Sequence, residues 1–153
     1  VMLDGIEDPY NFGYALRSLY SQGADGIILT KRNWMTAAGI VCRSSAGASE
    51  MLNMLYLDDE KELEVFKEAK IRIVCADLRD SVSIYSSDLS LPLLLVVGGE
   101  KRGISRAVLD SSDLNIRINY AREFGASLSA ASAATVIGAE IQRQNRLFCV
   151  SQT

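Results

Sequence analysis

Histidine is absent from all 153 residues of the chain. This absence excludes Ser-His-Asp and Cys-His catalytic groups, HExxH metal sites and histidine general bases. Proton transfer in any reaction of this protein therefore uses a carboxylate, lysine, arginine, tyrosine or cysteine side chain, or is only weakly catalysed.

Cysteine is scarce, and the three residues Cys42, Cys75 and Cys149 are far apart, each among apolar neighbours. An odd number of cysteines without a C-x-x-C motif argues against a disulfide framework and against a zinc site, and it fits a reducing compartment. We therefore predict buried structural thiols, no bound metal and a cytoplasmic location.

Long apolar runs and a strong net charge are also missing. The longest apolar run, Leu91–Val97, is far shorter than the about 20 residues of a membrane-spanning helix, and we recognise no signal peptide. The net charge of −3 and the pI of about 5.0 argue against a general nucleic-acid-binding surface, although a local basic patch stays open. Because the chain begins with Val1 inside an apolar segment, we expect an N-terminal region to precede it in a longer protein.

Segments typical of buried strands alternate along the chain with segments typical of helices. The predicted strands are Gly26–Thr30, Ile71–Ala76, Leu93–Val97 and Leu114–Ile118, with further apolar segments at Val1–Leu3 and Met51–Leu57. The predicted helices are Asn11–Gly23, Asn33–Cys42, Asp58–Lys70, Ser105–Leu109 and Ser127–Arg146, and Asp77–Ser90 is expected to be irregular. This pattern predicts one α/β domain, residues 1–153, with a mostly parallel sheet flanked by helices on both faces.

Ligands of parallel sheets bind beyond the carboxyl ends of the strands. Three loops are expected there: the loop before Asn11, the Gly98–Gly103 loop and the loop before Ser127. Residues that bind a ligand or catalyse a reaction are therefore expected in and around these three loops.

The first segment, DPYNFGYALRS at residues 8–18, predicts a helix with Asn11 as its N-cap. Gly13 in its first turn costs about 1 kcal/mol relative to alanine, and Arg17 lies at the edge of the apolar face. Two interpretations are open. Either Arg17 forms an ordinary surface pair, or its guanidinium holds a phosphate while Gly13 lets that phosphate or its sugar approach the helix.

The second segment, VVGGEKRGI at residues 96–104, is a strand that opens into glycines. It has neither the Walker A spacing nor the G-x-G-x-x-G spacing. It is either a tight strand-to-helix turn with solvated charges or a loop whose backbone approaches a ligand closely.

The third segment, GASLSAASAA at residues 125–134, is rich in small residues for a soluble helix. One interpretation is a tightly packed core helix with Ser127 as its N-cap. The other is that Ser127 and Ser129 offer hydroxyls and free amides to a ligand at the start of this helix.

In their order and spacing the three segments resemble the three motifs of the SpoU/TrmH family of RNA methyltransferases, which belong to the SPOUT class. The resemblance extends from about Asp4 to Arg143. The first motif, N-x-G followed by arginine, and the second, G-x-E-x-x-G, are matched fully by Asn11, Gly13 and Arg17 and by Gly98, Glu100 and Gly103.

The third motif is matched in part. Where the family typically has Ile-Pro-Met, this chain has Ile118-Asn119-Tyr120, and where the family has Ser-Leu-Asn it has Ser127-Leu128-Ser129. Asn119 thus replaces a proline and Ser129 replaces an asparagine.

The resemblance implies S-adenosylmethionine-dependent methylation of a ribose 2′-hydroxyl in tRNA or rRNA. It also implies a homodimer with the active site near its interface, and a deep trefoil knot formed by the C-terminal segment, which fold rules alone would not predict. The implied cofactor-binding residues lie in that knot: Val97, Gly98, Gly99, Gly103, Ile118, Tyr120, Ser127 and Leu128.

The implied catalytic residues are Arg17, Asn11, Glu100 and Ser127. Arg17 either acts as the base that is proposed for the family or, in the interpretation we prefer, stabilises the developing alkoxide and clamps the RNA phosphate. Asn11 would orient Arg17 or the ribose, and Glu100 would order the Gly98–Gly103 loop or pair with Arg17. Gly13 would make room for the RNA backbone.

RNA contacts are expected from Arg17, Lys101, Arg102 and Arg122, and Arg106, Lys31, Arg32 and Arg43 are further candidates for a local patch. One alternative is a catalytically impaired RNA-binding or assembly module, because Ser129 replaces the asparagine of the third motif. A more distant alternative is an unrelated α/β nucleotide-binding domain.

Overall fold

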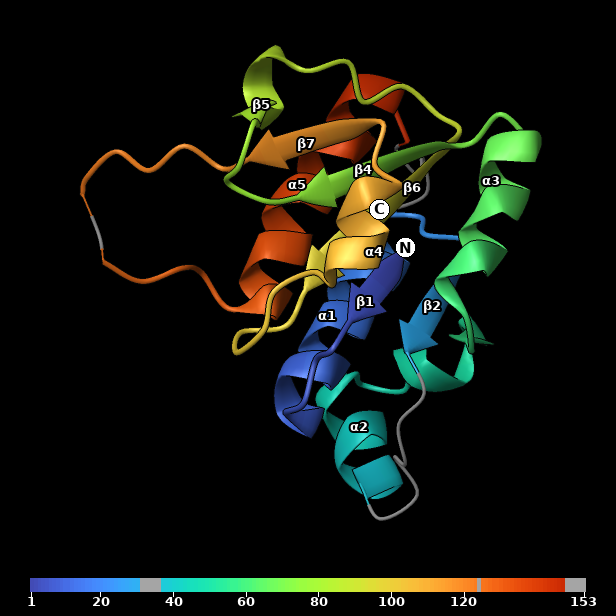
Figure 1. Cartoon of the computed structure of the whole chain (residues 1–153). Helices are drawn as coiled ribbons and strands as arrows, with labels where there is room; N and C mark the ends of the chain where they lie inside the picture. The colour runs from blue at the N-terminus through green and yellow to red at the C-terminus, as the bar shows by residue number, and fades with distance from the viewer. Residues whose placement is uncertain (31–36, 124, 148–153) are drawn as a thin grey trace.

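Seven strands form one sheet through the middle of the protein (Figure 1). The structure is a computed structural model, and it describes residues 1–30, 37–123 and 125–147. The strands are β1 Met2–Asp4, β2 Gly26–Thr30, β3 Asn53–Leu57, β4 Arg72–Ala76, β5 Val82–Ser83, β6 Leu93–Gly98 and β7 Leu114–Arg117. Their order across the sheet is β3-β2-β1-β6-β4-β7-β5, and every neighbouring pair is parallel. The predicted mostly parallel sheet is confirmed.

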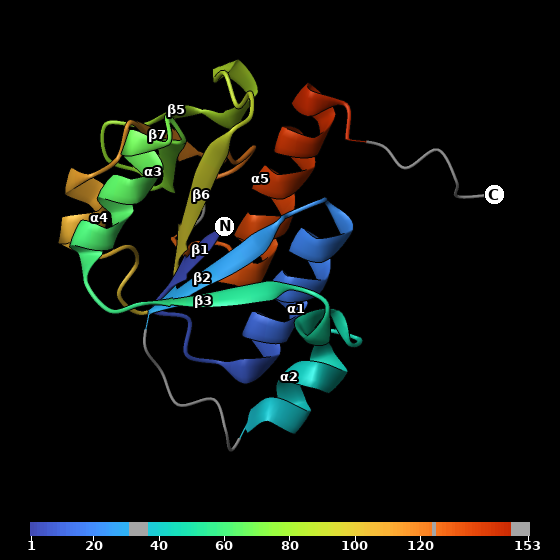
Figure 2. The same ribbon diagram turned by 90° about the vertical axis from the view of Figure 1, so that its right-hand side faces the viewer.

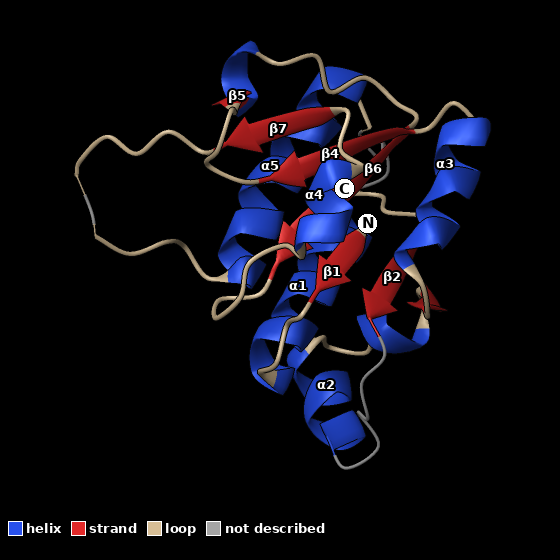
Figure 3. Cartoon of the chain, viewed as in Figure 1, coloured by secondary structure: helices blue, strands red, loops and turns tan. Residues whose placement is uncertain are grey.

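The described residues include five α-helices: α1 Pro9–Ser21, α2 Ala38–Ser44, α3 Glu64–Glu68, α4 Arg106–Asp110 and α5 Ala130–Asn145. The first four lie between strands in the sequence, and α5 follows the last strand, β7. Helices α1, α2 and α5 cover one face of the sheet, and α3 and α4 cover the other (Figure 2). Figure 3 shows the helices on either side of the strands. Short 3-10 turns occur at Ala48–Glu50, Glu60–Leu63 and Ile84–Ser86.

Two apolar cores lie on the two faces of the sheet, as expected for strands buried on both sides. Strand β6 shows the alternation clearly. Its Leu95 and Val97 belong to the core with α1 and α5, whereas Leu94 and Val96 belong to the core with α4. The near-continuous apolar run of β6 therefore follows from its central position rather than from a membrane environment.

Several predicted boundaries shift. The predicted helix Asp58–Lys70 is a 3-10 turn followed by the short α3, and the segment expected to be irregular contains β5. Helix α2 begins at Ala38, and the predicted start at Asn33 lies outside the described residues. No helix in the described part of the chain has the length and apolar character to cross a bilayer.

Asp8, not Asn11, is the N-cap of α1. The Asp8 carboxylate accepts a hydrogen bond from the Asn11 backbone N–H at 2.9 Å, and Pro9 occupies the first turn, where its missing N–H costs nothing. The prediction failed because Asp8 and Asn11 both suit an N-cap, and only Pro9 between them favours the earlier start. The Asn11 side chain is consequently free for a contact elsewhere.

Gly13 packs against a helix rather than making room for a ligand. A Cβ atom at Gly13 would lie 1.8 Å from Ser44 Oγ and 2.8 Å from Ser44 Cβ, both on α2. The expectation that this glycine admits the RNA backbone is therefore wrong. The glycine lets α1 and α2 approach each other closely, an advantage that offsets its poor helix propensity.

The N-cap of helix α5 lies two residues later than expected. Ser129 is the N-cap, and its hydroxyl accepts a hydrogen bond from the Ser132 N–H, so the prediction of Ser127 as N-cap is wrong. The small residues Ala131 and Ala134 of α5 are buried in the core that it shares with α1. This packing confirms the prediction of a tightly packed small-residue helix.

Gly13→Ala should lower the free energy of unfolding by about 1–3 kcal/mol, because the added methyl group overpacks the α1–α2 contact. The measurement is urea denaturation monitored by circular dichroism. Gly39→Ala in α2 is the matched control: its Cβ would meet only the Arg43 guanidinium at 3.9 Å, so stability should hold or rise. Equal stability of Gly13→Ala and wild type would contradict the packing role.

Candidate functional site

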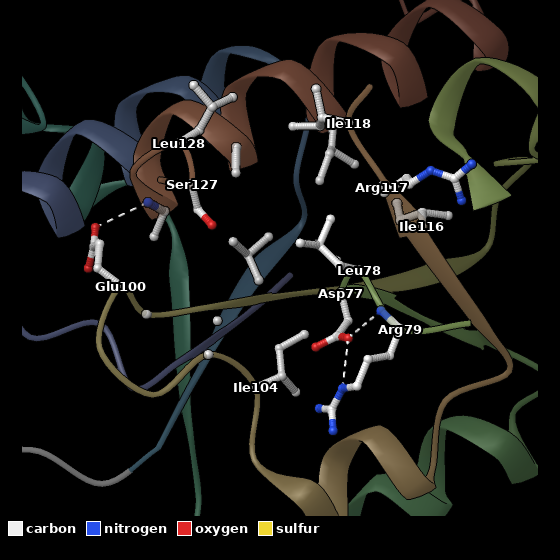
Figure 4. A pocket seen from close by; sticks show the side chains of 18 of the residues that line it. Asp77, Leu78, Arg79, Glu100, Ile104, Ile116, Arg117, Ile118, Ser127 and Leu128 are labelled. Atoms are coloured by element: carbon white, nitrogen blue, oxygen red, sulfur yellow. Dashed lines mark hydrogen bonds and ion pairs between the residues drawn. The ribbon is translucent and has the colours of Figure 1, made fainter. Parts of the chain in front are cut away.

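A cavity of about 400 Å³ opens at the carboxyl ends of β4, β6 and β7. Its location is the one expected for parallel sheets, where strand order reverses and adjacent loops diverge. Loops from all three strands and the start of α5 form its walls (Figure 4). The cavity is large enough for a small-molecule ligand.

Every residue proposed to bind the cofactor lines this one cavity. The lining includes Val97, Gly98, Gly99, Gly103, Ile118, Tyr120, Ser127 and Leu128, together with Glu100. The second and third sequence segments therefore meet in space, although about 20 residues of chain separate Gly103 from Ser127.

The Gly98–Gly103 loop is held by the N-terminal strand. Gly99 N–H donates to the Asp4 carbonyl at 2.7 Å, and the buried Asp4 carboxylate accepts from Ser105 N–H at 2.7 Å. A Cβ at Gly99 would lie 2.2 Å from the Gly5 carbonyl oxygen. The glycine is required because two backbones pass within contact distance at this point.

Glu100 joins the three sequence segments. One of its carboxylate oxygens, Oε1, accepts hydrogen bonds from Asn11 Nδ2 at 2.9 Å and from the Ala130 backbone N–H at 3.1 Å. Asn11 lies in the first turn of α1, Glu100 belongs to the loop after β6, and Ala130 begins α5. The prediction that Glu100 orders this loop is consistent with these bonds, whereas no ion pair to Arg17 occurs among the described residues.

Arg17 lies outside the cavity. Its side chain is exposed on α1, and it is not among the lining residues of the cavity. Tyr10 and Tyr14 lie on the same helical face at i, i+4 and i+7 spacing, and they are 52% and 50% exposed. Within one chain, therefore, the structure does not bring Arg17 to the cavity that the proposed cofactor-binding residues line. Four other predicted site residues are also not among the lining residues: Asn11, Lys101, Arg102 and Arg122.

The Tyr120 hydroxyl closes the third segment into a loop. It accepts a hydrogen bond from the Leu128 N–H at 2.9 Å, which ties the strand side of the loop to the start of α5. The Ser129 hydroxyl is used as the helix cap and bonds Ser132.

The sequence interpretation missed part of the cavity wall. Asp77, Leu78 and Arg79 follow β4 directly and line the cavity, as does Arg117 at the end of β7. Asp77 and Arg79 form an ion pair at 3.2 Å. Their position directly after a predicted strand was the available clue, because it places them at the same sheet edge as the glycine loop.

Comparison with known proteins identifies the family. A model of the SpoU rRNA methylase family matches residues 1–139. The chain belongs to this SpoU family.

Curated relatives match nearly the whole of this chain. The chain is 31% identical over 145 residues to a Staphylococcus haemolyticus protein assigned to the TrmH family of tRNA/rRNA methyltransferases, covering 94% of this chain and 58% of the relative. It is 34% identical over 148 residues to a tRNA/rRNA methyltransferase of Mycolicibacterium gilvum, covering 96% of this chain and 47% of that protein. The chain thus spans about half the length of the curated relatives it matches.

Solved structures share the fold. The SpoU methyltransferase AviRb from Streptomyces viridochromogenes, in complex with AdoMet, superimposes with a TM-score of 0.84 at 30% identity, over 95% of this chain and 57% of that one. An RNA 2′-O ribose methyltransferase superimposes with a TM-score of 0.82 at 25% identity, over 97% of this chain and 57% of that one.

Besides Arg17, five of the basic residues expected to contact RNA are exposed: Arg43, Lys101, Arg102, Arg106 and Arg122. Two of them form surface ion pairs, Lys101 with Glu7 at 2.6 Å and Arg106 with Asp110 at 2.8 Å. Lys31 and Arg32 lie outside the described residues. RNA contact by these residues stays a prediction.

The Cys75 thiol is buried in the core and structural rather than reactive. Burial raises the pKa of the Cys75 thiol to about 11, so it stays protonated at neutral pH. Cys42 is half-buried, so the prediction of full burial is wrong for it, and Cys149 lies outside the described residues. Within the described ranges no group of three or more acidic, histidine or cysteine residues is arranged to hold a metal ion.

Glu100→Ala should loosen the start of α5, because the Ala130 N–H loses its acceptor. We expect faster amide hydrogen exchange at Ala130 and Ala131 and a loss of stability of about 1–3 kcal/mol. Exchange is measured by NMR or mass spectrometry. The control is Glu123→Ala, an exposed carboxylate on the loop before α5. Unchanged exchange in Glu100→Ala would show that the bridge does not hold the helix.

Proposed function

We propose that this SpoU chain transfers a methyl group from S-adenosylmethionine to a ribose 2′-hydroxyl in tRNA or rRNA. The supporting observation is the Glu100 bridge, which links the start of α1, the glycine loop and the start of α5 at one cavity. Support also comes from the relatives named as tRNA/rRNA methyltransferases, the AdoMet complex of AviRb and the neighbour named as an RNA 2′-O ribose methyltransferase.

The cavity fits S-adenosylmethionine. Its walls include the apolar side chains Ile104, Ile116, Ile118 and Leu128, between which a flat purine ring can lie. The polar side chains Asp77 and Glu100 are part of the same wall, and the Gly98–Gly99 backbone has no side chain in the way. An apolar cavity with a few placed polar groups is the usual form of a cofactor site.

When bound, S-adenosylmethionine supplies an electrophilic methyl group on a sulfonium sulfur. The chain's own residues provide orientation and electrostatics. The Asn11 amide NH₂ donates to Glu100, which lines the cavity, and in this proposal the Asn11 amide oxygen accepts from the incoming ribose. Arg17 stabilises the alkoxide that develops as the ribose hydroxyl loses its proton, and it binds the neighbouring phosphate.

The exposed position of Arg17 is accounted for by a homodimer. We infer that the α1 face with Tyr10, Tyr14 and Arg17 contacts a second copy, which brings Arg17 near a cavity and covers two half-exposed tyrosines. We also propose that the C-terminal segment forms a trefoil knot at this cavity. The loops after β6 and β7 and the start of α5 would form the knot. RNA binding by a preceding N-terminal region would compensate for the chain's acidic pI.

The non-enzymatic alternative depends on Ser129. A serine side chain has no amide, so Ser129 lacks the group that the resembled motif has at this position, and its hydroxyl serves as the N-cap of α5. A chain that binds S-adenosylhomocysteine but transfers no methyl group to any RNA would support that alternative.

Arg17→Ala should reduce methyl transfer by at least about 100-fold, since one electrostatic stabiliser of the transition state is lost. The Kd for S-adenosylhomocysteine should stay within about twofold, because Arg17 does not line the cavity. The rate is measured with labelled methyl donor on unmodified tRNA and rRNA transcripts, and Kd by calorimetry. Lys61→Ala, an exposed cation on the 3-10 turn Glu60–Leu63 with no proposed role in the site, is the control. Wild-type turnover by Arg17→Ala would remove this mechanism.

Tyr14→Glu should convert the protein to a monomer and abolish methyl transfer, because a carboxylate is costly in an apolar interface. Sedimentation equilibrium should give twice the 16.7 kDa chain mass for wild type and the single mass for the variant, with unchanged circular dichroism. Tyr85→Glu, at a 62% exposed position far along the chain, should remain dimeric. A monomeric wild type with full activity is the outcome that the dimer proposal does not permit.

A further inference from the structure

The Asp77 carboxylate is held rigidly at the carboxyl end of β4. Its backbone N–H donates to the Ile116 carbonyl at 3.1 Å. Its Oδ1 accepts from the Arg79 backbone N–H at 2.8 Å and from Arg79 Nε at 3.2 Å. The side chain is only 18% exposed. Such a group is already oriented before any ligand arrives.

The second carboxylate oxygen of Asp77 is available to a ligand. Among the described residues no donor lies within hydrogen-bond distance of Oδ2, and this oxygen is not one of the fully buried polar atoms that lack a partner. Figure 4 shows the carboxylate among the lining residues, with Arg79 on one side of it. A carboxylate oxygen that is open only to a cavity is an acceptor for a donor inside that cavity.

The surroundings of Asp77 match a nucleoside. Ile116 and Ile118 lie on β7 and the loop after it, and Leu78, 74% exposed, lies at the rim. Methyl transfer is proposed to take place beside Glu100, which lies on another side of the cavity from Asp77 (Figure 4). Asp77 therefore faces a part of the cofactor that is remote from the RNA substrate.

We propose that Asp77 binds the ribose of the nucleoside cofactor, with Oδ2 accepting a hydrogen bond from a ribose hydroxyl. The inference rests on the proposed function, since it takes S-adenosylmethionine as the ligand of the cavity. The Arg79 guanidinium already offsets the Asp77 charge, so a neutral hydroxyl is a better match than a second cation such as the cofactor ammonium. A strand-end carboxylate performs the same task for the ribose in dinucleotide-binding folds.

Arg79 is a positioning residue in this account. It donates two hydrogen bonds to Oδ1, which leaves Oδ2 as the free acceptor and keeps the carboxylate turned into the cavity. Its own carbonyl accepts from Asn115 Nδ2 at 3.2 Å, so the turn is also tied to β7.

The test is calorimetric titration of wild type, Asp77→Asn and the control Asp80→Asn with S-adenosylhomocysteine and 5′-methylthioadenosine. Asparagine keeps an oxygen for Arg79 but presents an NH₂ group, which cannot accept, at the Oδ2 position. We expect both ligands to bind Asp77→Asn roughly tenfold more weakly. Asp80→Asn, an exposed residue of the same loop, should bind as wild type does, and the thermal midpoints of all three proteins should agree.

The ribose assignment is tested with the 2′-deoxy and 3′-deoxy analogues of 5′-methylthioadenosine. Wild type should bind at least one analogue roughly tenfold more weakly than the parent compound, and Asp77→Asn should bind all three equally. Weaker binding of S-adenosylhomocysteine alone would place Asp77 at the amino-acid end and overturn the assignment. Unchanged binding by Asp77→Asn would overturn the inference but not the proposed function. Absence of S-adenosylhomocysteine binding to wild type would overturn both.

Discussion

The site depends on one carboxylate oxygen, Glu100 Oε1. It accepts one hydrogen bond from the side chain of Asn11 and one from the backbone of Ala130, so three segments that are distant in the sequence are fixed at one point. The donor at Ala130 is one of the amides that a helix leaves unpaired at its start, and a carboxylate there also interacts favourably with the helix dipole. The Glu100 side chain thereby holds together three segments that make no contact through the sequence itself.

The strand order explains why those segments meet. Strand β1 lies between β2 and β6, so the chain leaves the centre of the sheet in one direction through β2 and β3 and later returns to the other side. The loop after β6 therefore lies between the segment that leads into α1 and the loop after β4. The bond from the Ala130 N–H to Glu100 brings the start of α5 to the same loop. Asp4 reinforces this proximity, since its carbonyl and its carboxylate accept from Gly99 and Ser105 at the two ends of the glycine loop.

Much of this arrangement could be predicted from the sequence. Buried strands in α/β domains are continuous apolar runs, so β2 was predicted with its observed bounds Gly26–Thr30 and β6 to within one residue. The cavity lining was predicted from the resemblance to the family motifs. Those motifs are recognisable because glycines and other small residues stand at fixed spacing where a backbone approaches a ligand or another backbone closely.

Other features could not be predicted because they depend on contacts across the fold. Gly13 is explained by Ser44, which comes 31 residues later in the chain, and no local pattern indicates that α2 packs there. Asp8 and Asn11 are equivalent as caps by chemistry, and the choice between them follows from Pro9 and from the contact of Asn11 with Glu100. Asp77 and Arg79 were missed because the segment after β4 has no motif, although its place at the sheet edge gives it a wall of the cavity.

The central claim is that the three segments joined by Glu100 form the cofactor site, and a crystal structure of the chain with S-adenosylhomocysteine tests it most directly. The account predicts the nucleoside between the loops after β6 and β7, with the sulfur atom directed toward Asn11 and Glu100. Ordered ligand bound elsewhere on the chain, or bound here with the sulfur directed away from Asn11, would contradict it.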